Sequence, residues 1–497
     1  MNTLFFRLVS GTLACLSGLA LWEIMQLKGV ALVQQPSLAS VAAACSIIAG
    51  LLGITGCLVP NRFWDRVLQK GKKLNTYFSQ SENPADHWSG SLLLSFSIIV
   101  YFVLMINLIP QQPAPANNDQ AAFLSQAKTV QESGGAVGLI RQLFAGEYLE
   151  ANQHPLYVTV ISFSPDYETG KRLSAMFGIL ALLLFSVGIA RQYGYLTGGL
   201  TGFLISVNAA YCQLTGRVVC EGLLLVFIAC LWLIVLRLPD LRQSHKTPCL
   251  SMIGIGLLLA LAWLTKGTPL LLILGLVIWL CSYAVNWYRC IPRSLTNATA
   301  DTETAEADQS KASTVPLKTI FGSLALVLTS FVLLASPLLV RNARVYGSPT
   351  FNANSYLMFQ DEFTEPHALA KQGSLREAAK AYWQTHSVSE IIQREVKGLL
   401  WEVFIFLRSL GPLPFTEGRL FFGLLAIPFL IVGLLAETGL ARRLYFIWMM
   451  LFWLAFAWYL PIAAGERFLM PLLLPTLAFI SLGVIRVGQF LTQERAA

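Results

Sequence analysis

Residues 319–340 read TIFGSLALVLTSFVLLASPLLV, a run without a single charged side chain. Its length matches the roughly 20 apolar residues that an α-helix needs to cross a bilayer. Similar runs recur along the chain, so we predict an all-α, polytopic transmembrane protein with about 12 spans. These spans lie near 4–25, 38–59, 90–109, 172–190, 196–213, 219–237, 249–264, 269–288, 319–340, 420–438, 444–461 and 468–489.

The composition agrees with a chain that lies largely in lipid. Hydrophobic residues make up 55% of the sequence and charged residues only 12%. A soluble protein carries about twice that charged fraction. The formal net charge of +8 is explained by basic cytoplasmic loops. Nucleic-acid binding needs a basic patch on a folded soluble domain, and the sequence predicts none, so the expected surroundings are the lipid bilayer.

The basic residues orient the chain in the membrane. With the N-terminus in the cytoplasm, the loops 61–88, 237–248 and 289–318 and the Arg442-Arg443 pair all face inward. Each short turn on the other side carries about one basic residue: Lys28, Arg217, Lys266 and Arg467. This asymmetry follows the positive-inside rule. It predicts a plasma (inner) membrane protein with both termini in the cytoplasm and with the long polar segments 111–171 and 346–398 outside.

These boundaries divide the chain into five parts. They are two N-terminal helices (1–60), a basic cytoplasmic loop (61–89), a transmembrane core with its external loop 111–171 (90–345), an extracytoplasmic or interfacial segment (346–419) and the C-terminal helices (420–497). Within the fourth part, 361–398 has helical apolar spacing typical of helices at a membrane surface. Residues 399–419 are aromatic and broken by proline, so we predict an interfacial or re-entrant segment unless they span the membrane.

Two acids near the predicted external surface are candidates for catalysis, because ionisable groups in membrane segments are functional candidates by default. Asp119 lies in the first long external loop, and its alternative is a helix N-cap. Glu221 follows an external hairpin. It stands four residues after Arg217, so its alternative is an ion pair at a helix end.

Several cationic and polar side chains are predicted at the same surface. His154 precedes Pro155 in the first external loop, and its alternative is an ordinary surface histidine. Lys266 occupies a short external turn, where the alternative is a lysine that extends to the interface. Arg341 and Asn342 directly follow the run quoted above, and Arg467 precedes the last span.

Together these groups suit transfer of a group from a lipid-linked phosphate. A carboxylate can take a proton from a hydroxyl or amine nucleophile. Fixed Lys and Arg side chains can hold a phosphate and stabilise its charge as it departs. The sequence contains no glycine-rich nucleotide-binding loop, which argues against a cytosolic sugar-nucleotide donor.

The order of the motifs resembles a known class of enzymes. An acid in the first large external loop is followed by Asn-x-x-Pro-Leu-Tyr at 152–157, by Arg-x-x-x-Glu at 217–221 and by Leu-Thr-Lys-Gly-Thr at 264–268. A Pro-x-x-x-Arg-Asn-x-x-x-x-Gly stretch at 337–347 and Glu-Arg-Phe-x-x-Pro at 466–471 come after. This pattern is similar to the GT-C membrane glycosyltransferases, in particular the branch of the protein O-mannosyltransferases and the lipid A aminoarabinose transferase. It covers about 90–350, and 460–490 more weakly.

The resemblance implies a GT-C-like core that transfers a sugar with inversion from a polyprenyl-phosphate carrier to a lipid, glycan or protein acceptor, in the cell envelope. It implies that Asp119 is the general base or a carboxylate that positions the acceptor, and that Glu221 is a second acid. The donor phosphate would contact His154, Lys266 and Arg341. The supporting positions are Arg217, Asn342 and Arg467.

The sequence also departs from that pattern. Asp119 has Asn118 and Gln120 as neighbours, where many members have a second acid, and His154 replaces the first proline of a common Pro-Pro-Leu. A multi-pass transporter and a non-catalytic scaffold of an envelope glycan assembly complex stay open as alternatives. We predict no fixed metal site, although one or two carboxylates could hold Mg²⁺ or Mn²⁺.

Overall fold

The computed structural model describes residues 84–112, 118–238, 249–282 and 317–494, apart from positions 415, 417, 438 and 464, together with six isolated positions before residue 60. Within these residues the chain is predominantly helical and has no β-strand, and one isolated bridge pairs Asn208 with Pro412. The predicted all-α class is therefore confirmed.

Six of the described helices are long and apolar enough to cross a membrane. They are α4 (Pro84–Gln111), α8 (Tyr167–Tyr193), α14 (Leu317–Tyr346), α18 (Arg419–Ala436), α19 (Leu440–Tyr459) and α20 (Met470–Glu494). Shorter apolar helices accompany them: α9 (Tyr195–Val207), α11 (Glu221–Arg237), α12 (Cys249–Thr265) and the helix Leu270–Ser282. The protein is thus a multi-pass membrane protein. The spans predicted near 4–25 and 38–59 lie outside the described residues, and the total of about 12 remains a prediction.

The span predicted at 196–213 is divided into α9 and α10 (Ala209–Thr215). Asn208 separates them: its Oδ1 accepts the Tyr211 N–H at 2.9 Å, and its Nδ2 donates to the Ser409 carbonyl at 2.8 Å. A helix can break inside a membrane only where other groups satisfy the freed backbone. Here the segment just after α17 (Val388–Ser409) does so, because the Leu413 N–H donates to the Val207 carbonyl at 2.8 Å.

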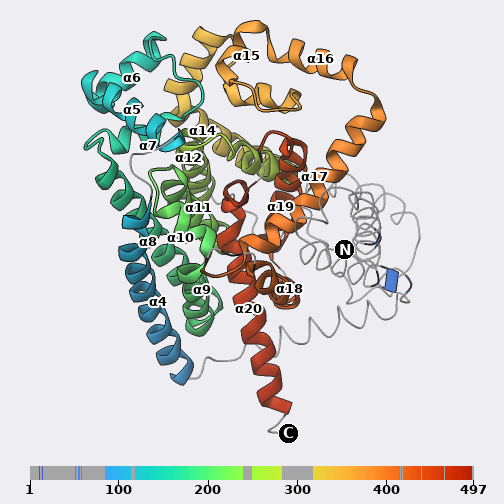
Figure 1. Cartoon of the computed structure of the whole chain (residues 1–497). Coiled ribbons are helices and arrows are strands. Elements are labelled where there is room, and N and C mark those ends of the chain that lie inside the picture. The colour runs from blue at the N-terminus through green and yellow to red at the C-terminus, as the bar shows by residue number, and fades with distance from the viewer. Residues whose placement is uncertain are drawn as a thin grey trace, which may run out of the picture.

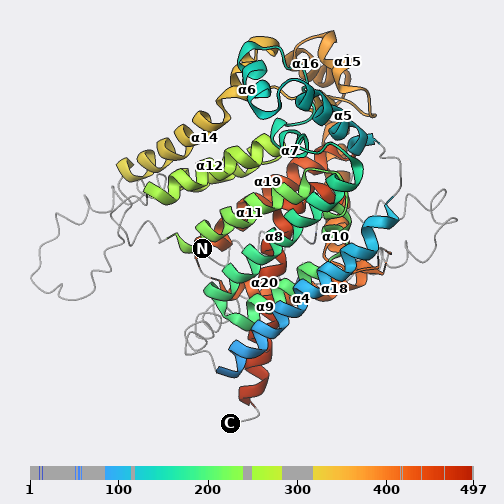
Figure 2. The ribbon, with the colours of Figure 1, turned by 90° about the vertical axis from the view of Figure 1, so that its left-hand side faces the viewer.

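The two long polar segments lie at the same end of the helix bundle (Figures 1 and 2). The first forms α5 (Asn118–Glu132), α6 (Gly135–Ala145) and α7 (Pro155–Ile161), and the second forms η3 (Ala353–Phe359), α15 (Pro366–Gln372) and α16 (Leu375–Thr385). We call these six elements the loop layer. The Ala353 N–H donates to the Ala151 carbonyl at 3.2 Å and so joins the two halves of this layer.

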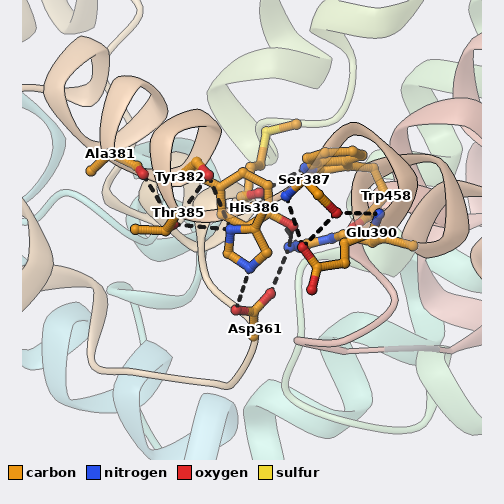
Figure 3. A network of polar contacts seen from close by, with 10 residues as sticks. Asp361, Ala381, Tyr382, Thr385, His386, Ser387, Glu390 and Trp458 are labelled. Carbon is orange, nitrogen blue, oxygen red and sulfur yellow. Dashed lines mark hydrogen bonds and ion pairs between the residues drawn. The ribbon is translucent and has the colours of Figure 1, made fainter.

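Local capping determines where the helices of the second polar segment begin. The Ser387 hydroxyl accepts the Glu390 N–H at 3.3 Å, and the Glu390 carboxylate accepts the Ser387 N–H at 2.7 Å, which is a capping box at the start of α17. Just before it, His386 Nε2 lies 3.0 Å from an Asp361 carboxylate oxygen, and the His386 ring stacks on Tyr382 (Figure 3). The polar sequence therefore produces the helices predicted for 361–398.

Close packing of two glycines joins α18 to α20, which is the most buried of the six long apolar helices. A Cβ at Gly433 would lie 1.8 Å from the Phe479 carbonyl oxygen, and one at Gly483 would lie 1.8 Å from the Phe429 carbonyl oxygen. Small residues at such contacts let two helix backbones approach closely.

Replacing Gly483 with alanine should therefore lower the stability of the folded protein by roughly 1–3 kcal/mol, the usual cost of overpacking. The measurement is the midpoint of thermal unfolding in detergent. Gly488→Ala is the matched control on the same helix, since no atom lies within 4 Å of a Cβ at that position. Equal midpoints for the two variants would contradict this packing.

Candidate functional site

Four charged side chains meet where the loop layer covers the ends of α11 and α20. An Arg467 Nη1 donates to Asp119 Oδ2 at 2.6 Å, and Arg467 Nε donates to Glu221 Oε1 at 3.1 Å. The same Glu221 oxygen accepts a hydrogen bond from Lys266 Nζ at 2.8 Å. Arg467 therefore bridges the two predicted catalytic acids, and Glu221 bridges Arg467 to Lys266.

Glu221 is the buried centre of this site. Its side chain is 0% exposed, whereas Lys266 is 13%, Arg467 36% and Asp119 53% exposed. A carboxylate removed from water must be paired, since an unpaired buried charge is very costly. Lys266 and Arg467 provide that pairing. The exposure of the side chains thus increases across the site, from the buried Glu221 to the half-exposed Asp119.

Arg217 does not form the helix-end ion pair with Glu221 that its spacing of four residues allowed. Within the described residues, Arg217 Nε instead donates to Gln112 Oε1 at 2.9 Å, at the end of α4. The reason is that Glu221 begins α11 while Arg217 lies before that helix, so the two do not share a helical face. Arg217 therefore ties α4 to the turn that leads into α11.

Asp119 is held in place by its neighbour in the sequence. The Gln120 side chain is buried, and its Oε1 accepts the Val218 N–H at 3.0 Å, which attaches the first turn of α5 to the turn before α11. Asp119 lies within that first turn, where a carboxylate is favoured by the helix dipole. It is not the N-cap, and its carboxylate contacts Arg467. Gln120 therefore fixes the position of the turn that carries Asp119.

Lys266 follows the last residue of α12, in the turn before the helix Leu270–Ser282. Its ammonium lies 5.8 Å from the centre of the Phe468 ring as well as 2.8 Å from Glu221. The lysine therefore reaches into the protein and does not extend to the bilayer surface. The other cation of the site, Arg467, stays positively charged. The Glu221 carboxylate, and to a smaller extent Asp119, raise its pKa, although burial opposes this.

His154 lies beside the Lys266 turn. It is the N-cap residue of α7 and is buried, and its Nε2 lies 3.1 Å from Asn352 Nδ2. A Cβ at Gly267 would stand 3.3 Å from the same Nε2 atom, so only glycine leaves this approach unstrained. Burial, and then the charge of Arg341, lower the pKa of His154 to about 4. The ring is therefore neutral near pH 7, unlike an ordinary surface histidine.

Arg341 and Asn342 connect α14 to the loop layer. Arg341 is buried, and its Nη1 donates to the Glu150 carbonyl and, at 3.3 Å, to the Tyr148 carbonyl. Asn342 Nδ2 donates to the Pro349 carbonyl at 3.0 Å. Arg341 is thus near enough to His154 for its charge to act on that ring, but its guanidinium is hydrogen-bonded to backbone carbonyls between α6 and α7. Its contact with a donor phosphate stays a prediction.

The sequence analysis gave no role to three residues that lie beside this site, although one of them, Glu466, begins the motif at 466–471. Glu466, which directly precedes Arg467, is buried and contacts Arg408 Nε at 2.7 Å and an Arg419 Nη1 at 3.0 Å. Its position next to Arg467 was a usable signal. The two arginines lie 47 and 58 residues earlier in the sequence, so no local pattern points to them.

Among the described residues, no group of three or more His, Cys, Asp or Glu side chains is arranged to hold a metal ion. The two acids considered for Mg²⁺ or Mn²⁺, Asp119 and Glu221, both contact Arg467. A divalent cation there would compete with that guanidinium for the same carboxylates.

No protein-family model and no curated protein matches the sequence. Two of the solved structures that match the chain have the following TM-scores. The archaeal oligosaccharyltransferase AglB from Archaeoglobus fulgidus, in complex with an inhibitory peptide and a dolichol-phosphate, has a TM-score of 0.42 and 12% identity over 82% of this chain and 51% of that chain. The S. cerevisiae protein O-mannosyltransferase Pmt1-Pmt2 complex, bound to the sugar donor, has a TM-score of 0.32 and 16% identity over 58% of this chain and 37% of that chain.

This chain therefore spans about half, or less, of the length of the solved chains it matches.

The buried histidine makes the stability of the protein depend on pH. The unfolded chain takes up a proton at His154 near its usual pKa of 6.5, whereas the folded chain does so only near pH 4. His154 therefore disfavours the folded state increasingly as the pH falls from about 6.5 to about 4. As the pH is lowered from about 6.5 to about 4, the thermal midpoint of His154→Gln should therefore rise relative to that of the parent protein. A difference independent of pH would contradict a neutral buried ring.

Proposed function

We propose that this protein is a glycosyltransferase that moves a sugar from a polyprenyl-phosphate carrier to a lipid, glycan or protein acceptor. The observation that carries the proposal is the bridge made by Arg467 between a half-exposed acid, Asp119, and a buried acid, Glu221, which also binds Lys266. An accessible carboxylate beside two fixed cations is what such a transfer requires.

In the proposed reaction, Asp119 takes the proton from a hydroxyl or amine of the acceptor as that atom attacks the anomeric carbon. The bond between this carbon and the carrier phosphate oxygen breaks, and its electron pair leaves on the phosphate. Lys266 and Arg467 stabilise the charge that develops there, since fixed cations in a site with little water act strongly on a departing phosphate. The products are the glycosylated acceptor and free polyprenyl phosphate.

For Glu221 we propose a role other than that of the second acid, which the resemblance of the motifs implied. Its side chain is fully buried, and its carboxylate contacts two cations. We therefore assign it to positioning Lys266 and Arg467, not to contact with the acceptor. Such a residue contributes by holding the cations where charge develops, which costs no rearrangement during the reaction.

The proposed site faces the extracytoplasmic side of the plasma membrane. Support comes from the basic loops 61–88, 237–248 and 289–318, which the positive-inside rule places in the cytoplasm. The loop layer lies at one end of the bundle (Figure 1), and its residue Asp119 contacts Arg467. Transporters gather their charges near the middle of the bilayer, so this arrangement favours the transferase. A scaffold would need no half-exposed acid paired to an arginine that also binds a buried acid.

Asp119→Asn tests the base directly. With a panel of synthetic short-chain polyprenyl-phosphate sugars and membrane extract as the acceptor source, release of free polyprenyl phosphate should fall about 10²–10⁴-fold, the usual contribution of a general base. Mass spectrometry measures this product whatever the sugar is. Glu132→Gln, an exposed acid at the other end of α5, is the control and should retain full release. Unchanged release by Asp119→Asn would rule out the proposed role.

Lys266→Gln tests the phosphate contact. Losing one charge-assisted hydrogen bond of about 1.5–3 kcal/mol should weaken binding of a short-chain polyprenyl phosphate roughly 10–100-fold. Isothermal titration with the protein in lipid nanodiscs gives the Kd. Lys128→Gln, which changes an exposed lysine on α5, should bind as the parent does.

Mass spectrometry of glycolipids and glycoproteins from cells that lack the gene then identifies the acceptor. An unchanged profile would count against a transferase.

A further inference from the structure

A second cluster of charges lies directly beside the proposed site. Glu466 accepts hydrogen bonds from Arg408 at the end of α17 and from Arg419 at the start of α18, at 2.7 and 3.0 Å. The side chains of Glu466 and Arg419 are 6% and 2% exposed, and that of Arg408 is 25% exposed. None of these three residues contacts Asp119 or Lys266 in any described hydrogen bond or ion pair. The proposed reaction gives them no task.

Three consecutive residues of η4 (Glu466–Phe468) point to three different parts of the protein. Glu466 binds the two arginines of α17 and α18, and Arg467 binds Asp119 and Glu221. The Phe468 ring stacks on that of Phe456 in α19 at 4.6 Å. These contacts hold η4 against α17, α18, α5, α11 and α19.

The η4 segment needs such attachment because it has little stability of its own. A single 3₁₀ turn forms few hydrogen bonds and does not persist in isolation. Gly465 precedes it, and a Cβ there would meet no atom within 4 Å, so packing at Gly465 does not hold the turn. The backbone that carries Arg467 is therefore held by the side chains next to Arg467 in the sequence together with its continuation into α20.

We propose that Glu466, clamped between Arg408 and Arg419, is a positioning residue that fixes Arg467 for contact with the carrier phosphate, an inference that rests on the proposed function. Glu466 acts only through Arg467. Loss of its charge leaves two guanidinium groups facing a neutral partner, and η4 shifts relative to Glu221. Arg467 then no longer presents its guanidinium at the site, whereas Lys266, which is attached to α12, keeps its place.

A double-mutant cycle tests this dependence. The variants are Glu466→Gln, Arg467→Gln and their combination, and the measurement is the Kd for a short-chain polyprenyl phosphate by titration in nanodiscs. Because a small displacement of a binding group is costly, Glu466→Gln should weaken binding about tenfold in the parent protein. In the Arg467→Gln background it should weaken binding less than about twofold, since coupled residues are not additive. Glu466→Asp should restore most of the affinity in the parent protein.

Two further variants keep the result interpretable. Glu437→Gln removes an acid at the other end of α18, where it contacts Tyr193, and should leave the Kd unchanged. If Glu466→Gln does not fold, Arg408→Gln loosens the same clamp while Arg419 still holds Glu466, and it should show the same non-additive effect with Arg467→Gln.

The outcomes separate the two proposals. An unchanged Kd in Glu466→Gln, or a loss of the same size in both backgrounds, would overturn the clamp and leave the glycosyltransferase proposal standing. A parent protein that does not bind polyprenyl phosphate would overturn both. Normal binding with undiminished release by Asp119→Asn would overturn only the proposed base.

Discussion

The charge of Glu221 is the constraint on which the rest of the site depends. A carboxylate fully removed from water must be neutralised by close partners, and Lys266 and Arg467 supply that neutralisation. These partners come from the end of α12 and from the turn before α20, so the buried acid fixes the relative positions of three helices. Arg467 then extends to Asp119 in the loop layer. One buried charge thus organises the end of the bundle where the site lies.

The helix bundle also contains irregular backbone, which is tolerated inside a membrane only where other polar groups satisfy it. Among the described residues, the break between α9 and α10 is one such place. Asn208 divides α9 from α10 and bonds to Ser409 at the end of α17. Beyond this, Arg419 binds Glu466 beside the site. The segment 399–419, which the sequence left between an interfacial, a re-entrant and a spanning structure, is therefore the physical link between the broken helix and the charged cluster.

The loop layer contributes both placement and a special environment. Gln120 anchors the turn that carries Asp119, and Arg341 and Asn342 attach the ends of the two polar segments to α14. His154 is buried so completely that its ring is neutral near pH 7. A neutral histidine beside the Lys266 turn can donate or accept a hydrogen bond without adding charge. The loop layer therefore holds the charged residues in place without adding a further charge at His154.

The sequence by itself determined that the chain is helical and crosses a membrane, because long apolar runs admit no other structure in lipid. It also indicated Asp119, Glu221, Lys266 and Arg467, since charged residues are few and stand at the ends of those runs. Only the tertiary structure decided their pairing. Arg217 stands four residues from Glu221 yet binds Gln112, while Arg467 binds Asp119 from 348 residues away. Such contacts depend on how whole helices pack, and periodicity along one helix carries no information about its distant partners.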